Sequence, residues 1–234
     1  MRNVLILGGS RGIGRALVQR YLSAGDRVYA TVRAPVELEG ATVLSEVDLR
    51  DDAACLALPH RLSALGVSQL DIVIVNAGVL MREHLEHLEP GAPSGAEARE
   101  AAFERIEEQM EVNALGPLRV ATSLLPLLGE GARLALVSSR RGSLGDCSTG
   151  GSYGYRMSKA AANIAFVTLA RDLAPRGVSV AVLHPGFVQT DLTGGRGDIS
   201  AAEAAAGIFD RIESVELSNS AAAFLHATDE ALPW

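Results

Sequence analysis

The sequence predicts an α/β fold, a doubly wound sheet of about seven parallel strands with helices on both faces. Short apolar runs rich in β-branched residues recur along the chain, and each precedes a longer helix-compatible stretch. Such runs indicate strands buried on both faces, because right-handed crossovers place helices above and below a parallel sheet. The expected strands are Val4–Leu7, Val28–Val32, the weaker Thr42–Val47, Leu70–Val75, Leu134–Val137 and Val178–Leu183.

Length and composition favour one globular domain, residues 1–234, since 48% of the 234 residues are hydrophobic and 21% are charged. A formal net charge of −7 argues against nucleic-acid and anionic-membrane partners. The two cysteines, Cys55 and Cys147, are far apart and suggest no disulfide framework. The apolar run at Val4–Leu7 is too short for a signal peptide, so we expect a cytoplasmic protein.

A glycine-rich turn, Gly8-Gly9-Ser10-Arg11-Gly12-Ile13-Gly14, follows the first expected strand and precedes a helix-compatible stretch. Glycines allow close backbone approach, and a helix N-terminus offers unpaired N–H groups to a pyrophosphate. The alternative is a plain strand-to-helix turn, which also uses glycine. The position after the first strand favours a Rossmann-type nucleotide site. The residues expected to bind cofactor here are Gly8, Ser10, Arg11, Gly12, Ile13 and Gly14.

The region after the second strand indicates which nicotinamide cofactor is bound. NAD-binding proteins usually place an acid there for the ribose 2′-hydroxyl, but no acid occurs before Glu37. Arg33 and Arg11 can instead hold a 2′-phosphate through charge-assisted hydrogen bonds. The alternative is that both arginines are only solvated. The sequence therefore predicts NADP(H) in preference to NAD(H).

Tyr155 and Lys159 form the strongest catalytic candidate. Four residues apart on an expected helix, they share one face. Lys159 is the only lysine in the chain, beside twenty arginines, so a compact ammonium is specifically required there. A nearby ammonium favours the phenolate, and we expect it to bring the pKa of Tyr155 toward neutral pH. The alternative is a surface pair of no functional consequence.

These motifs, in this order, resemble the short-chain dehydrogenase/reductase family over nearly the whole chain. The pattern Ser138-Ser139-Arg140-Arg141-Gly142-Ser143 is similar to the C-factor/Sniffer-like carbonyl reductase branch. Leu7 departs from the family, which usually has Thr there to support the turn. The resemblance implies a catalytic set of Asn113, Ser139, Tyr155 and Lys159. It also implies cofactor contacts at Asp48, Leu49, Asn76, Ala77, Gly78, Tyr155, Lys159, Pro185, Gly186, Val188 and Thr190.

Several of these assignments have alternatives. Ser138 and Ser143 compete with Ser139 for the substrate oxygen, and Asp48 is also placed to cap the following helix. Asn113 stands four residues before Pro117, which lacks the N–H that would bond its carbonyl. The resemblance gives Asn113 a proton-relay role through water, whereas a simple proline kink would give it none.

The expected activity is hydride transfer between NADP(H) and an aldehyde, ketone, quinone or alcohol, with Tyr155 as proton donor. The alternative is an NADP-binding regulatory or signalling protein with little turnover. The group Glu83, His84, Glu86 and His87 reads as a solvated helix face, and no metal is expected. The substrate walls are expected at 140–152 and 187–200, and the family resemblance implies a homodimer or homotetramer.

Overall fold

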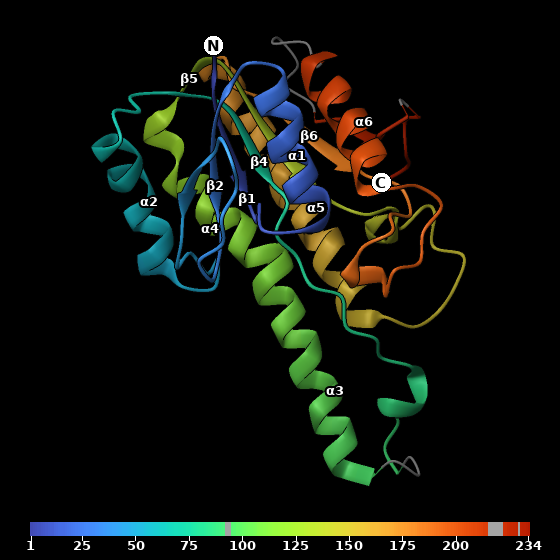
Figure 1. The fold of residues 1–234 in the computed structure, drawn as a ribbon. Helices are drawn as coiled ribbons and strands as arrows, with labels where there is room; N and C mark the ends of the chain where they lie inside the picture. The colour runs from blue at the N-terminus through green and yellow to red at the C-terminus, as the bar shows by residue number, and fades with distance from the viewer. Residues whose placement is uncertain (92–94, 215–221, 229) are drawn as a thin grey trace.

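The computed structural model describes residues 1–91, 95–214, 222–228 and 230–234. Its centre is a seven-stranded parallel sheet in the order β3-β2-β1-β4-β5-β6-β7, covered by helices on both faces (Figure 1). The predicted doubly wound α/β sheet is therefore confirmed. The strands are β1 (Asn3–Leu7), β2 (Arg27–Thr31), β3 (Thr42–Leu44), β4 (Leu70–Val75), β5 (Leu128–Val137), β6 (Ser179–His184) and β7 (Phe224–His226).

The limits of β1, β2 and β6 differ from the predictions by one residue, and larger differences occur at β3, at β5 and at β7, which has no predicted counterpart. The Thr42–Val47 prediction is too long, because β3 ends at Leu44 and Glu46 takes a left-handed backbone conformation with φ 60°. β5 starts at Leu128, earlier than predicted, within a stretch whose glycines hide the strand pattern. β7 has only three residues, too few for an apolar run to be recognised.

The helices are α1 (Gly12–Ser23), α2 (Asp52–Ala64), α3 (Gly95–Met110), α4 (Gly116–Ser123), α5 (Tyr153–Leu173) and α6 (Ala201–Ser214). A π-helical turn, Glu111–Leu115, joins α3 to α4. Short 3₁₀ turns are Leu85–His87, Leu125–Leu127, Arg140–Gly142, Ala174–Arg176 and Asp191–Thr193. None of the helices described in the chain is both long and apolar enough to span a membrane.

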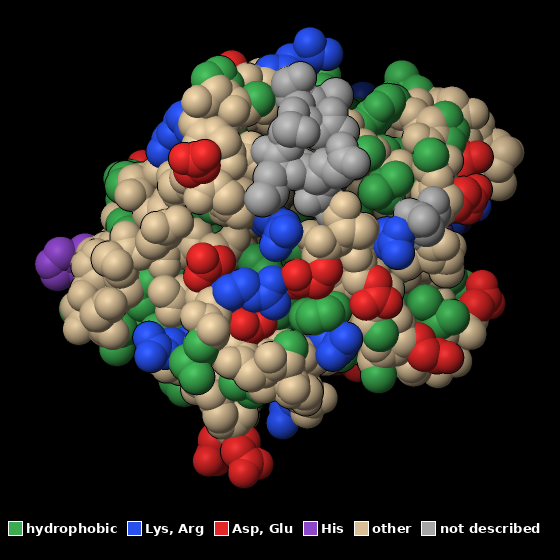
Figure 2. Space-filling view, turned by 90° about the horizontal axis from the view of Figure 1, so that it is seen from above, with side chains coloured by type: hydrophobic (Ala, Val, Ile, Leu, Met, Phe, Trp, Pro, Cys, Tyr) green, Lys and Arg blue, Asp and Glu red, His purple; other side chains and the backbone are tan. Residues whose placement is uncertain are grey.

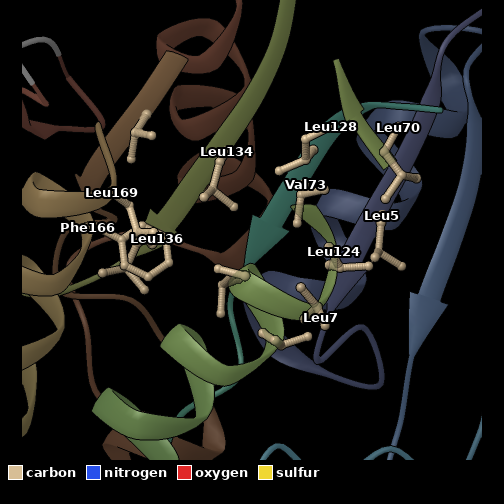
Figure 3. Packing of buried hydrophobic residues seen from close by; sticks show 14 of the residues in the cluster. Leu5, Leu7, Leu70, Val73, Leu124, Leu128, Leu134, Leu136, Phe166 and Leu169 are labelled. Atoms are coloured by element: carbon tan, nitrogen blue, oxygen red, sulfur yellow. The ribbon is translucent and has the colours of Figure 1, made fainter. Parts of the chain in front are cut away.

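The two sheet faces bury separate apolar clusters, because side chains alternate along each strand. Val4 and Ile6 pack with α1 and α6 on one face. Leu5 and Leu7 lie in the cluster on the other face, with residues of α2, α4 and α5. Figure 3 shows part of this second cluster, where Phe166 and Leu169 of α5 lie near Leu134 and Leu136 of β5. The double-sided core holds the carboxyl ends of the strands in a fixed arrangement.

The opposite end of the sheet, where the strands begin, carries ion pairs. Arg2 joins Asp26 and Glu213, each at 2.7 Å, and so ties the start of β1 to β2 and α6. Figure 2 looks onto this end and shows basic and acidic side chains next to one another at its centre. Arg133 also pairs with Glu213 here, at 3.8 Å.

Candidate active site

A cleft of about 500 Å³ opens at the carboxyl ends of β1, β2, β4, β5 and β6. This is where doubly wound sheets bind ligands, near the point at which strand order reverses between β1 and β4. The structure brings most of the predicted site residues together around it. Those that line the cleft are Gly8, Ser10, Arg11, Gly12, Ile13, Arg33, Asp48, Leu49, Asn76, Ala77, Gly78, Tyr155, Lys159, Pro185 and Thr190.

Five predicted residues do not line the cleft. Gly14 is buried in α1, where a Cβ would collide with the Gly8 carbonyl oxygen and approach Asn76 Nδ2 to 2.6 Å. Gly186 has φ +94°, in the region that favours glycine, and Val188 is 3% exposed. Asn113 and Ser139 are also buried, behind the lining residues.

The glycine turn forms a pocket suited to a phosphate. α1 begins at Gly12, and its N-cap residue Arg11 makes no side-chain capping bond, so the first N–H groups of the helix face the cleft uncapped. Asn76 Nδ2 donates to the Gly8 carbonyl at 3.0 Å and joins the turn to β4. Leu7 does not loosen the turn, because Thr31 Oγ1 of β2 accepts from Gly8 N at 3.2 Å. This geometry fits a dinucleotide pyrophosphate.

The charged residues that line the cleft include Arg11, Arg33, Asp48 and Asp191. Arg33 is exposed, and Arg11 Nη1 lies 3.1 Å from Asp191 Oδ2 across the opening. Asp48 binds Arg50 at 2.7 Å, and this hydrogen bond holds the pKa of the Asp48 carboxyl below its usual value. The alternative role of Asp48 as a helix cap is wrong, since Asp51 caps α2 by accepting from Ala53 N. Asp48 is thus free of a capping role.

Tyr155 and Lys159 lie side by side in α5, with exposed fractions of 7% and 4%. Lys159 Nζ is 5.9 Å from the centroid of the Tyr155 ring and donates to the Val137 carbonyl at 3.0 Å. Burial lowers the pKa of Lys159 to about 8. Burial also raises the pKa of the Tyr155 phenol, and it outweighs the opposing effects of the Ser139 hydrogen bond and the Arg141 charge. The expectation that Lys159 brings this pKa toward neutral is therefore wrong for the protein alone, because desolvation dominates.

The three candidate serines have different partners. The Ser139 side chain acts on the Tyr155 phenol and lowers its pKa, and Ser139 Oγ accepts from Arg141 N at 3.2 Å. Ser138 Oγ donates to Asn163 Oδ1, and Ser143 Oγ accepts from Asp146 N at 3.0 Å. Ser139 is the serine whose hydroxyl meets the phenol.

Asn113 lies in the π-helical turn between α3 and α4 and is fully buried. Its side chain accepts from Val79 N and donates to the Val79 carbonyl, both at 2.8 Å, and donates to Ser158 Oγ at 3.1 Å. A Cβ on Gly78 would lie 3.1 Å from Asn113 Oδ1 and 3.6 Å from Lys159 Nζ. The proline kink considered as an alternative is part of a π-helical turn. This turn places Asn113 close to Lys159, with Gly78 next to both side chains.

The model of the family described as short chain dehydrogenase matches residues 2–199. The chain belongs to the short-chain dehydrogenase family. It is 37% identical, over the full length of both chains, to 1-hydroxy-2-glutathionyl-2-methyl-3-butene dehydrogenase of Rhodococcus sp. strain AD45. It is also 43% identical to C-signal of Myxococcus xanthus over 125 residues, which cover 53% of this chain and 75% of that protein.

Solved structures agree with this assignment. The structure of a short-chain dehydrogenase/reductase from Burkholderia multivorans with bound NADP matches with a TM-score of 0.84 and 26% identity, over all of both chains. Carbonyl reductase Sniffer of D. melanogaster matches with a TM-score of 0.85 and 25% identity, also over all of both chains. The likeness to C-factor and Sniffer proteins is thus confirmed. This short-chain dehydrogenase is an oxidoreductase that acts on CH–OH and C=O groups by hydride transfer.

The group from Glu83 to His87 in this short-chain dehydrogenase differs from the prediction. The expected solvated face is wrong for Glu83, which is 0% exposed, because its carboxylate lies between Gln109 of α3 and Gly154 of α5. His84 and His87 flank a 3₁₀ turn with ring centroids 5.5 Å apart. In the part of the chain that is described, no group of three or more His, Cys, Asp or Glu residues could hold a metal ion.

Sequence reasoning missed several lining residues of this short-chain dehydrogenase. Asp191 and Gln189 flank the predicted Thr190, and Thr31 ends β2 one residue before the segment considered for the ribose. The rule that residues just after a strand line the cleft would have found Val79, which directly follows the predicted Asn76-Ala77-Gly78. Arg15 and Val112 carry no local signal, because helix packing brings them to the cleft, whereas Gln189, Asp191 and Leu192 lie within the substrate wall predicted at 187–200.

Proposed function

We propose that this chain, acting as one domain of residues 1–234, is a carbonyl reductase that uses NADPH in preference to NADH. The observation that carries the proposal is the placing of Tyr155 and Lys159, the only lysine, in one cleft with the glycine turn. NADPH, when bound, supplies a hydride to the carbonyl carbon. The relatives with NADP or carbonyl reductase in their descriptions support this choice.

Tyr155 is proposed to donate the proton that the reduced carbonyl oxygen requires. Burial raises the pKa of its phenol, so the side chain carries its proton at neutral pH. A protonated phenol is the form needed for reduction, and this favours reduction over alcohol oxidation near pH 7. Ser139, hydrogen bonded to Tyr155, is proposed to orient the same oxygen.

Lys159 and Asn113 are proposed to hold and return protons behind Tyr155. A pKa of about 8 lets Lys159 exchange protons near neutral pH. Asn113 lies across Gly78 from the ammonium and is fixed by its three hydrogen bonds. This position suits a relay residue that orders the path between Lys159 and solvent.

The preference for NADP(H) is proposed to come from Arg33 and Arg11. Both line the cleft, Arg11 within the glycine turn and Arg33 just after β2, where the adenosine ribose is expected. Arg33 is exposed and forms none of the ion pairs found among the described residues. The guanidinium is therefore available to a 2′-phosphate. The remaining predicted cofactor contacts, from Asn76 to Thr190, are proposed in the roles that the family resemblance implies.

The substrate is proposed to have an apolar body attached to its carbonyl. The expected walls, 140–152 and 187–200, contain three exposed apolar side chains, Leu144, Phe187 and Leu192. Arg141 adds a cation whose charge acts on Tyr155. Quinones, aryl ketones and aldehydes with an acidic substituent match these walls.

We also propose that the chain is cytoplasmic and forms a homodimer or homotetramer through the region around α3 and α5. Phe103, Leu115 and Ile164 are large apolar side chains with exposed fractions of 41%, 44% and 63% on this side. Light scattering of the purified protein tests the assembly, and substitution of Ile164 with Glu is expected to produce monomers.

The test of the activity is NADPH consumption, followed by its absorbance, over aldehydes, ketones and quinones, with NADH in parallel. We expect turnover with NADPH and a kcat/KM at least about tenfold lower with NADH. Tight NADPH binding without turnover on any substrate would instead favour the regulatory alternative.

A further inference from the structure

The segment that follows β4, residues 79–83, is held between α3 and α5 by side chains of two buried polar residues. Asn113 bonds both backbone groups of Val79, and Gln109 Oε1 accepts from Met81 N at 2.8 Å. Gln109 and Asn113 are four residues apart and face the same segment. The segment therefore forms a rigid link from the predicted catalytic Asn113 toward α5.

Glu83 ends this segment and is completely buried. Its Oε1 accepts from Gln109 Nε2 at 2.7 Å, and its Oε2 accepts from Gly154 N at 3.1 Å. Its backbone carbonyl accepts from Ser152 N at 2.7 Å. Both donors to the carboxylate are neutral groups. A buried carboxylate needs stronger compensation than this, because losing its hydration is costly.

The start of α5 supplies that compensation. α5 runs for 21 residues, and its N-cap Ser152 has φ 52° and makes no side-chain capping bond. The amino end of a helix carries a partial positive charge and unpaired N–H groups, which favour an acidic partner. Glu83 thus caps α5 from outside the helix, through the amide of Gly154, the residue before Tyr155.

Close packing fixes this cap in place. A Cβ on Gly154 would lie 2.5 Å from Gln109 Nε2 and 2.8 Å from Ile106 Cα, so α5 approaches α3 as closely as a glycine allows. α3 and α5 run next to each other at this point (Figure 1). The first turn of α5 cannot shift toward α3, and the bond to Glu83 keeps it from shifting away.

We propose that Glu83 is a positioning residue, whose carboxylate, held by Gln109, fixes the first turn of α5 and so sets the Tyr155 phenol against Ser139. The inference rests on the proposed role of Tyr155. The inference predicts that loss of the Glu83–Gly154 bond moves the Tyr155 phenol away from Ser139. Proton transfer from Tyr155 to the carbonyl oxygen then becomes slower.

The primary variant is Glu83→Gln. It keeps the side-chain shape, but the amide nitrogen that it introduces must face either Gln109 Nε2 or Gly154 N, and two donors cannot bond. Gln109 cannot simply turn over, because its Oε1 is held by Met81 N. We expect kcat to fall about tenfold or more while the Kd for NADPH changes less than about twofold. Weakening the effect of Ser139 raises the pKa of the Tyr155 phenol. The decline of kcat at high pH should therefore occur about half a pH unit higher than in the wild type.

A double variant, Glu83→Gln with Gln109→Glu, restores the hydrogen bonds to Gly154 N and Met81 N and between positions 83 and 109, and it loses only the bond that Gln109 Nε2 donates to the Arg105 carbonyl at 3.1 Å. The carboxylate introduced at position 109 accepts from the amide introduced at position 83 and from Met81 N. We expect it to recover most of the lost kcat and to return the pH profile toward that of the wild type. Glu86→Gln is the matched control, since its side chain is 75% exposed and pairs only with His87 among the described residues. The control is expected to behave as the wild type.

Hydrogen exchange of backbone amides gives a readout that does not depend on activity. Glu83→Gln should speed exchange in residues 152–156 while the middle of α5 keeps its protection. If the wild type itself shows no turnover, the proposed function fails and the exchange result still decides on the cap. Unchanged kcat, pH profile and exchange in Glu83→Gln, or a double variant no better than the single one, would overturn the inference. If Glu83→Gln does not fold but the double variant folds and is fully active, the inference is supported.

Discussion

The ammonium nitrogen of Lys159 lies 5.9 Å from the centroid of the Tyr155 ring and bonds the Val137 carbonyl. In this arrangement burial decides the protonation of both groups: it lowers the pKa of Lys159 to about 8 and raises that of Tyr155. The phenol therefore keeps its proton at pH 7, whereas Lys159 is still mostly an ammonium that can exchange its proton near neutral pH. A neutral phenol ready to donate and an amine able to exchange protons suit reduction of a carbonyl.

Replacing Arg33 with Asp should reverse the cofactor preference. A guanidinium bound to a phosphate contributes about 1.5–3 kcal/mol, so the Kd for NADPH should rise about tenfold to a hundredfold. NADH lacks the 2′-phosphate, and its Kd should stay the same or fall. Fluorescence titration with both cofactors measures the change. Arg27→Asp, at the other end of β2, is the control, and an equal loss for both cofactors in Arg33→Asp would contradict the assignment.

Asp191→Asn should strengthen NADPH binding. Asp191 pairs with Arg11 at 3.1 Å, and both side chains are largely exposed, at 74% and 69%. Such a pair contributes about 0–1 kcal/mol to stability, so the melting temperature should hardly change. Freed from Asp191, Arg11 can turn to the 2′-phosphate, and the Kd for NADPH should fall up to about fivefold. A matching fall for NADH would show that the phosphate is not what Arg11 binds.

Gly14→Ala should abolish cofactor binding or destabilise the fold. A methyl group at Gly14 would meet the Gly8 carbonyl and the Asn76 amide, which are both parts of the turn. Moving them costs about 1–3 kcal/mol by overpacking. Gly150→Ala is the control, because a Cβ there has no neighbour within 4 Å among the described residues. Thermal unfolding with and without NADPH separates the two effects, and wild-type behaviour in both would disprove the close approach.

The fold was predictable because its signals are local and periodic. Apolar runs mark β1, β2, β4 and β6, and the glycine turn and Tyr155–Lys159 spacing mark two sides of the cleft. What escaped prediction depends on tertiary contacts. Glu83 is in a polar stretch that looks solvated, and only the packing of α3 against α5 buries it. The pKa of Tyr155 likewise depends on the depth of its burial, which spacing alone cannot give.

Acid should destabilise the protein through His184. Burial, together with the smaller effects of the His226 and Arg140 charges, lowers the pKa of His184 from 6.5 to about 3. The stabilising contribution is complete above the unfolded value of 6.5 and is lost as pH falls toward 3, since only the unfolded chain takes up the proton. Between pH 7 and 4 this loss is about 3 kcal/mol.

Urea unfolding at pH 7 and pH 4 tests this, with His184→Gln alongside the wild type. The variant should lose less unfolding free energy than the wild type over this interval. Equal losses in the two proteins would show that His184 is not protected from protonation by its burial.

Tyr155→Phe tests the central claim most directly, with Tyr153→Phe in the same helix as the matched control. The measurement is the rate of NADPH oxidation at saturating carbonyl substrate, together with the Kd for NADPH. We predict that Tyr155→Phe loses about a hundredfold or more of kcat while it binds NADPH as the wild type does, because general acid catalysis is removed. Tyr153→Phe should keep its activity. A folded Tyr155→Phe protein that reduces the substrate at the wild-type rate would contradict the account.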